Sequence, residues 1–123
     1  MTLQELYERI DGNYTQATNV LKMEKLIDRY VRKFVNSDLL TKLDEAGKTL
    51  DPTGIFESTH AIKGVCGNLG FDRLAAAASE LSEEFRPGKG RQLTDAQVQE
   101  KLQALKEKYQ ATVDGINAYI SGQ

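Results

Sequence analysis

The sequence predicts an all-α fold, an antiparallel four-helix bundle with one or two additional short helices. Apolar residues recur three and four positions apart over long runs, and short connections join these runs. Only two prolines are present, and no run alternates as a half-buried strand would. At 123 residues the chain has the length of one domain. We therefore expect a single domain over residues 1–123, in which residues 1–13 form a short accessory helix and residues 17–121 form the bundle.

Two helices are predicted in the first 35 residues. Apolar residues at helical spacing begin at Leu3 and stop before the Asp-Gly-Asn run at 11–13, so the first helix is short. A longer repeat continues through Val35 and predicts one long amphipathic helix. The apolar face of this helix consists of Val20, Met23, Ile27, Tyr30 and Phe34, flanked by Leu26 and Val31.

The next two helices have capping residues at their predicted starts. The Asn-Ser pair at 36–37 can cap a helix that runs from about residue 38 to residue 48. Asp51 suits the N-cap of a fourth helix, and Pro52 suits its first position, where a missing N–H costs nothing. This helix should end near Gly70, and it carries the single histidine of the chain, His60.

Two further helices complete the pattern. Asp72 can cap a fifth helix that runs to Phe85 and is closed by Pro87. Thr94, with Gln97 three residues later, matches a capping box. The apolar repeat that follows predicts a last helix of some 25 residues, which runs close to the C-terminal end.

Composition and charge exclude several classes of partner. A formal net charge of −2 lacks the basic excess of a duplex-binding domain, so we expect no nucleic-acid partner. No stretch reaches the roughly 20 apolar residues of a membrane span, and the N-terminus lacks the features of a secretory signal. We therefore expect a cytoplasmic protein without a membrane partner. The lone cysteine, Cys66, suits a reducing compartment and is expected to be a small buried apolar residue.

His60 is predicted to face solvent. At about 100° per residue, the fourth helix gathers one apolar stripe, and His60 falls roughly 160° from the centre of that stripe. The residues of the stripe are Ile55, Thr59, Ile62, Val65, Cys66 and Leu69.

The side of the helix that carries His60 is suited to phosphate chemistry. An imidazole can attack phosphorus, and the ammonium group of Lys63 can offset the charge on phosphoryl oxygens. Glycine inside a helix costs about 1 kcal/mol relative to alanine, so Gly64 and Gly67 indicate a need for open approach to the imidazole. Close packing against another helix is the alternative for Gly67. The neighbours of His60 at helical spacing are Phe56, Lys63, Gly64, Gly67 and Phe71.

The segment that follows His60 resembles the signature of histidine-containing phosphotransfer domains, the relay modules of multistep two-component signalling. The order of helices matches the same family, so the resemblance covers the chain from about Tyr14 to the end. Ile62 stands where the family usually has leucine. The matching residues are His60-x-x-Lys63-Gly64, then Leu69-Gly70, then Leu74 and Leu81.

The resemblance implies a function. His60 would accept a phosphoryl group from the aspartyl phosphate of a receiver domain and pass the group to another receiver. Lys63 would neutralise phosphate charge, and Gly64 would keep the approach to His60 open. The expected partners are response-regulator receiver domains and a hybrid histidine kinase. No metal or other cofactor is expected on this chain, because the magnesium belongs to the receiver, and no ATP-dependent kinase activity is expected.

The partner surface should surround His60. Phe56, Gly67 and Phe71 are the candidate docking residues on the fourth helix and at its end, although Phe71 would alternatively fill the junction to the fifth helix. The resemblance implies that residues of the long second helix line the other side. We expect a monomer.

The main alternative is a non-enzymatic helical adaptor that binds receiver domains or other partners without phosphotransfer. Enzymatic alternatives lack their motifs, because the chain contains no P-loop, no dinucleotide fingerprint and no set of nucleophile, base and orienting acid. One histidine and one cysteine on different faces of a helix do not make a metal site.

Overall fold

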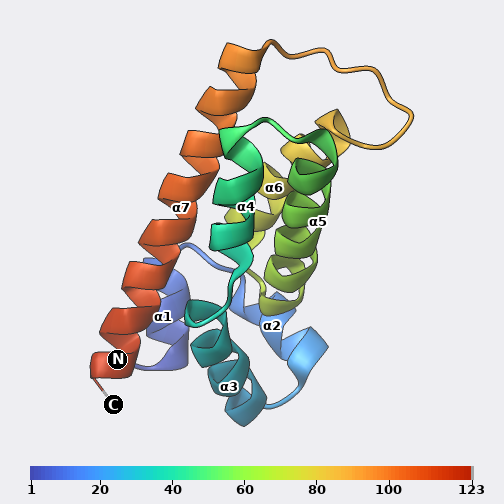
Figure 1. Cartoon of the computed structure of the whole chain (residues 1–123). Helices are drawn as coiled ribbons and strands as arrows, with labels where there is room; N and C mark the ends of the chain where they lie inside the picture. Colours follow the sequence, from blue (N-terminus) through green and yellow to red (C-terminus); the bar gives the residue numbers. More distant parts are fainter. Residues whose placement is uncertain (123) are drawn as a thin grey trace.

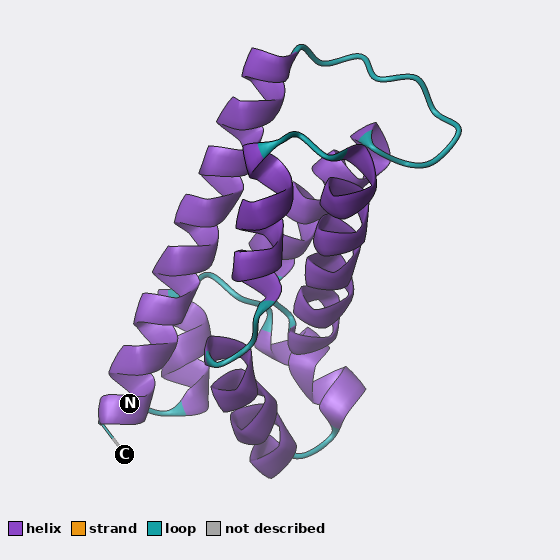
Figure 2. Cartoon of the chain, viewed as in Figure 1, coloured by secondary structure: helices purple, strands orange, loops and turns teal. Residues whose placement is uncertain are grey.

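A computed structural model describes residues 1–122, and in these residues it contains seven helices and no strand (Figures 1 and 2). The predicted all-α fold is therefore confirmed. The helices are α1 (Leu3–Arg9), α2 (Tyr14–Leu21), α3 (Glu24–Val35), α4 (Leu39–Lys48), α5 (Pro52–Leu69), α6 (Asp72–Glu84) and α7 (Asp95–Ser121).

Four helices form the bundle, and the three short N-terminal helices extend one end of it. Helices α4, α5, α6 and α7 contact one another in a ring, while α1 and α3 contact the lower part of α7 and α2 contacts α5 (Figure 1). The core is mainly aliphatic, and it also holds buried aromatic residues, namely Tyr7, Phe34, Phe71, Phe85, Tyr109 and Tyr119. Its largest fully buried side chains include Leu6, Tyr7, Ile27, Leu43, Ile55, Ile62, Leu74, Leu81, Leu102, Leu105 and Ile116.

The single long helix predicted through Val35 is wrong, because the chain turns between α2 and α3. Asn13 caps α2 by accepting a hydrogen bond from the backbone N–H of Gln16. At the other end of α2, Lys22 has a positive φ of 68° and Met23 is extended, which redirects the chain. The turn lets α2 contact α5 while α3 contacts α7. One straight helix could not follow both directions.

Helix α5 begins and ends where the sequence indicated. Pro52 occupies the first turn, and Gly70 ends the helix with the left-handed φ of 75°. Asp51 occupies the N-cap position, but its side chain makes no capping hydrogen bond. A Cβ on Gly70 would lie 2.2 Å from the carbonyl oxygen of Asn13, so the position requires glycine. The same glycine accepts a hydrogen bond from the Asn13 N–H at 2.7 Å.

The predicted N-cap of α6 is wrong, whereas the predicted capping box of α7 is present. Asp72 was predicted as the N-cap of α6, but Phe71 holds that position and Asp72 is the first helical residue. The Asp72 carboxylate instead accepts a hydrogen bond from the Asn13 side chain at 3.0 Å. Thr94 and Gln97 form the predicted capping box of α7.

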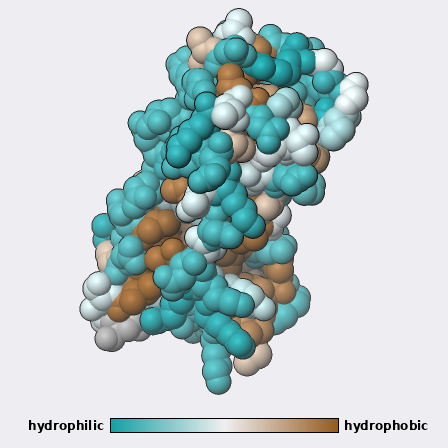
Figure 3. Space-filling model, in the orientation of Figure 1, coloured by the Kyte–Doolittle hydropathy of each residue, from teal (hydrophilic) through white to brown (hydrophobic). Residues whose placement is uncertain are grey.

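The surface is not uniform in hydropathy. In the view of Figure 3, apolar surface gathers over the lower half of the molecule, where the N-terminal helices lie, and the upper part is mostly polar. No helix in residues 1–122 is long and apolar enough to cross a membrane.

Candidate functional site

The imidazole of His60 is exposed on the side of α5 that faces away from the core, as predicted. The half-buried ring of Phe56, one turn earlier, stacks against it with the centroids 5.5 Å apart and the planes 21° apart. Within residues 1–122, no hydrogen bond or ion pair engages the imidazole. One face of the ring is therefore supported by Phe56, while its nitrogen atoms remain available to a partner.

Two glycines leave the surface beyond His60 bare. Gly64 lies one turn and Gly67 two turns further along α5, and a Cβ added at either position would meet nothing within 4 Å. The open space at Gly67 contradicts the alternative that this glycine permits close packing against another helix. By contrast, a Cβ on Gly115 of α7 would lie 2.6 Å from a methyl carbon of Ile10, which is a true packing glycine.

Lys63 is the cation nearest to His60 along the exposed side of α5. It is exposed, and it forms no ion pair with any residue between 1 and 122. An unpaired ammonium three residues from an imidazole can reach the oxygens of a phosphoryl group held at that imidazole. The structure thus brings together the three residues predicted for the chemistry, namely His60, Lys63 and Gly64.

Phe71 does not belong to the exposed site. Only 3% of this residue is exposed, and its ring packs against Tyr7 at 5.7 Å and Phe34 at 5.2 Å between centroids. The prediction that Phe71 is a docking residue is therefore wrong, and the alternative that it fills the junction to the next helix is correct. The helix ends at Leu69, so helical spacing no longer places Phe71 beside His60.

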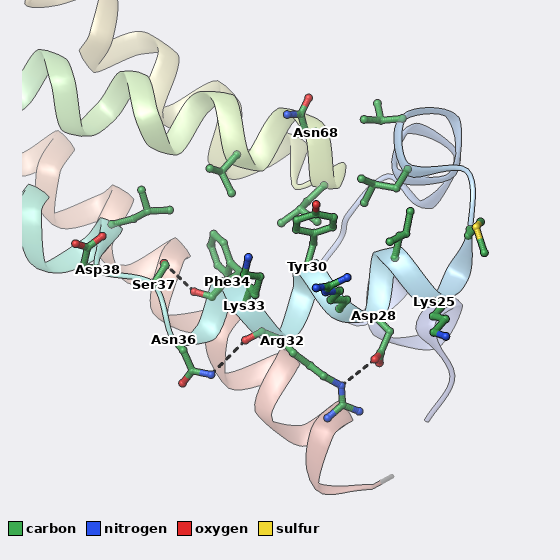
Figure 4. Close-up of a pocket in the computed structure, with 18 residues that line it drawn as sticks. Lys25, Asp28, Tyr30, Arg32, Lys33, Phe34, Asn36, Ser37, Asp38 and Asn68 are labelled. Carbon is green, nitrogen blue, oxygen red and sulfur yellow. Dashed lines mark hydrogen bonds and ion pairs between the residues drawn. The ribbon is translucent and has the colours of Figure 1, made fainter.

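A groove lies next to this site, between α3, the end of α2 and the C-terminal half of α5. Val65 was predicted to be in the core, but it is 38% exposed and lines this groove. Val65 sits at the edge of the apolar stripe, on the side that borders the groove. Figure 4 shows Tyr30 pointing from α3 toward the α5 segment that carries Asn68. The residues before Val35, which were expected to line the partner surface, form one wall of this groove, and their contact with a partner stays a prediction.

The groove residues outside α5 were missed as functional candidates. Val20, Met23 and Tyr30 were assigned to a buried helix face, because their spacing continues that of Ile27 and Phe34. The break at Lys22 leaves these three side chains exposed instead. The unusual backbone at Lys22 has no glycine or proline to mark it, so the sequence carried no local signal.

The other reactive side chain of α5 is unsuited to chemistry. Cys66 is buried, and this burial raises the pKa of its thiol to about 12, so the nucleophilic thiolate is not populated near neutral pH. Among residues 1–122, no group of three or more His, Cys, Asp and Glu side chains could hold a metal ion.

Comparison with protein families identifies the family of the chain. The model of the Hpt domain matches residues 22–115. Because this match spans more than half of the chain, the protein belongs to the Hpt domain family, as the motif around His60 had indicated. Hpt domains carry out histidine phosphotransfer in two-component signalling, interact with receiver domains and histidine kinases, and lack kinase activity of their own. No curated protein and no solved structure matches the chain significantly.

Proposed function

We propose that this protein is a phosphorelay intermediate that accepts a phosphoryl group on His60 from the aspartyl phosphate of one receiver domain and passes it to another. One observation supports this proposal most strongly. His60 is exposed on α5 with unpaired Lys63 one turn away, and the surface beyond it at Gly64 and Gly67 is open.

The transfer requires little from the protein beyond position and charge. The unprotonated ring nitrogen of His60 would supply an electron pair to phosphorus and form a P–N bond. The P–O bond to the aspartate of the receiver would break, and the carboxylate would keep its electron pair. Lys63 would stabilise the negative charge on the phosphoryl oxygens during this in-line displacement. The Phe56 ring would hold the imidazole in one orientation, which lowers the entropic cost of the encounter.

The partners and conditions of the relay are part of the same proposal. A hybrid histidine kinase would supply the first receiver domain, and a response regulator would carry the second. Magnesium would be bound by the receiver, with none required on this chain. We place the relay in the cytoplasm as a monomeric protein, where a reducing environment keeps Cys66 as a free thiol.

Transfer from a phosphorylated receiver domain tests the proposal. The wild-type chain should acquire a phosphate that is labile to acid and stable to base, and His60→Gln should acquire none. Lys108→Gln introduces the same amide at an exposed position of α7 and serves as the control, which should be labelled like wild type. Labelling that survives in His60→Gln would overturn the assignment.

The same experiment separates the relay from an adaptor. An adaptor would bind receiver domains, with equal affinity for wild type and His60→Gln, and would show no phosphate on either. Binding measured by calorimetry, together with labelling on the same samples, distinguishes the two functions. Binding without labelling of the wild-type chain would support the adaptor and contradict the relay.

A further inference from the structure

The apolar surface of the chain is concentrated at the groove beside the site. Five large hydrophobic residues are exposed in residues 1–122, and four of them line this groove. They come from α2, the α2–α3 connection, α3 and α5, so the patch is assembled by the fold and not by one helix. These four residues are Val20 (41% exposed), Met23 (56%), Tyr30 (42%) and Val65 (38%).

A row of cations borders the apolar patch. Lys25, Arg29 and Lys33 are four residues apart on α3, which places them along one line of the helix, and all three line the groove. All three are exposed, and none forms an ion pair within residues 1–122. Their neighbour Arg32, by contrast, is bound to Asp28 at 2.9 Å (Figure 4). We call Lys25, Arg29 and Lys33 the cation row.

The cation row is unfavourable for the isolated chain. Like charges four residues apart on a helix destabilise it by about 0.2–0.5 kcal/mol per pair. The chain as a whole carries a net charge of −2, so the row is a local positive field on a slightly acidic molecule. An external group with negative charge would relieve this repulsion.

The dimensions of the groove favour a protein partner. Its volume of about 1400 Å³ exceeds the roughly 300–1,000 Å³ of common small-molecule sites. A membrane would require the apolar side chains to project from one helix face beneath the cations. Here the apolar side chains line a hollow between helices, where a projecting element of a protein can enter.

The groove is continuous with the site on α5. Val65 and Asn68 line the groove and lie five and eight residues beyond His60, which corresponds to about 7 and 12 Å along the helix axis. The bare surface at Gly64 lies between them and His60. A globular partner seated in the groove would extend far enough along α5 to reach the segment that carries His60.

We propose that the cation row is a specificity element, which selects receiver domains whose docking face carries carboxylates around an apolar centre. This inference rests on the proposed function, because it concerns the partner of the same site. The apolar patch would supply contact area, and Lys25, Arg29 and Lys33 would speed association with acidic faces and slow it with basic ones.

Reversal of the charge of the cation row tests whether the row selects among receiver domains. The triple variant Lys25→Glu/Arg29→Glu/Lys33→Glu is compared with Arg9→Glu/Lys48→Glu/Lys108→Glu, which makes the same change in charge at exposed residues outside the groove. The probes are purified receiver domains of differing surface charge, each phosphorylated with acetyl phosphate. The measured quantity is the second-order rate constant of transfer, divided for each variant by the rate of labelling with phosphoramidate, a small donor that needs no docking.

The expected result depends on the receiver and on salt. For receivers with an acidic docking face, reversal of the row should lower the normalised rate constant about 10- to 100-fold at low ionic strength. The loss should shrink to about twofold near 1 M salt, where the screening length is about 3 Å. Receivers with a basic face should gain, and the control triple variant should follow wild type.

Three results would overturn the inference. They are an equal loss for all receivers, a loss that does not depend on salt, and an equal loss in the control variant. Binding of wild type to vesicles of anionic phospholipid, abolished by reversal of the row while transfer is unchanged, would also overturn it and indicate a membrane surface. A wild-type chain that accepts no phosphate on His60 from phosphoramidate or receivers would instead overturn the proposed function, so the two failures differ.

Discussion

At the residue scale, the decisive feature is the contrast between His60 and the core residues of its own helix. Helical spacing placed His60 opposite the apolar stripe, and the structure agrees because α5 is regular from Pro52 to Leu69. The same spacing failed for Phe71, which lies past the end of the helix, and for Val65 at the edge of the stripe. The sequence thus predicts side-chain direction well inside a regular helix and poorly at its margins.

Substitution of Gly64 tests whether the absence of a side chain at this position lets a receiver domain reach His60. Gly64→Leu should slow transfer from a receiver by about tenfold or more, because a branched side chain one turn from His60 obstructs the in-line approach. Stability should not fall, because the added Cβ meets nothing within 4 Å and glycine is a poor helix former. Transfer kinetics and urea unfolding followed by circular dichroism measure the two effects.

The control for this change is Gly115→Ala. Its Cβ would lie 2.6 Å from Ile10, so this variant should lose stability. A stability loss in Gly64→Leu of the same size as in Gly115→Ala would show that Gly64 is needed for packing, contrary to the access role.

At the element scale, the first helix supports the end of the helix that carries the site. The Tyr7 hydroxyl of α1 donates a hydrogen bond at 2.6 Å to the carbonyl oxygen of Leu69, the last residue of α5. Burial raises the pKa of Tyr7, so its hydroxyl keeps its proton and remains a donor. The carbonyl oxygen of Leu69, which has no partner within its own helix, thereby receives a hydrogen bond inside the protein.

Tyr7→Phe should therefore lower the free energy of unfolding by about 1–3 kcal/mol, because it leaves the Leu69 carbonyl without this donor in a buried place. Tyr30→Phe is the matched control, since the Tyr30 side chain is exposed and should change stability little. Urea unfolding of both variants measures the difference. Equal stability of Tyr7→Phe and wild type would refute the anchoring role of α1.

The break between α2 and α3 shows where element prediction fails. Helical periodicity continues through residues 20–34, and no helix-breaking residue stands at the turn. The turn follows from contacts with other helices, because α2 packs against α5 while α3 packs against α7. Tertiary contacts of this kind are invisible to a local pattern, and the groove that they create was invisible for the same reason.

At the scale of the whole molecule, the sequence predicted the bundle but not the surface that the bundle assembles. The positions of the four bundle helices follow mainly from the apolar periodicity, and for α7 also from its capping box, which are local properties. The groove combines residues from α2, α3 and α5 and depends on the relative placement of these helices. The sequence could predict that His60, Lys63 and Gly64 lie together because all three belong to one helix. It could not predict that Val20 and Val65, which belong to different helices, line the same groove.

Stability as a function of pH should depend on Glu84. Its carboxylate, largely buried, accepts hydrogen bonds from the backbone N–H groups of Leu93 at 2.7 Å and Gln92 at 2.8 Å, and so fixes the loop that leads to α7. The Leu93 bond is the main reason that the pKa of Glu84 lies below its usual value. A lowered folded-state pKa contributes stability above the unfolded-state value of 4.5, and this contribution is lost as pH falls through the folded-state pKa.

The comparison of Glu84→Gln with wild type checks this dependence. The variant should be less stable by about 1–3 kcal/mol near pH 7, and the gap should narrow at acidic pH, as the wild-type carboxylate takes up its proton. Glu80→Gln removes only an exposed ion pair with Lys101 and should cost less than about 1 kcal/mol at either pH. A gap for Glu84→Gln that is constant across this range would contradict the pKa direction.

The stacking of Phe56 on His60 gives the imidazole a magnetic resonance signal that is sensitive to changes at this site. An aromatic ring in contact with an imidazole shifts the magnetic resonance signals of that imidazole through its ring current, and this chain has one histidine only. A proton spectrum therefore contains a single set of imidazole signals, without overlap from others. Occupancy of the ring nitrogen, protonation and the arrival of a partner can each be followed in that one set, in real time and without a label.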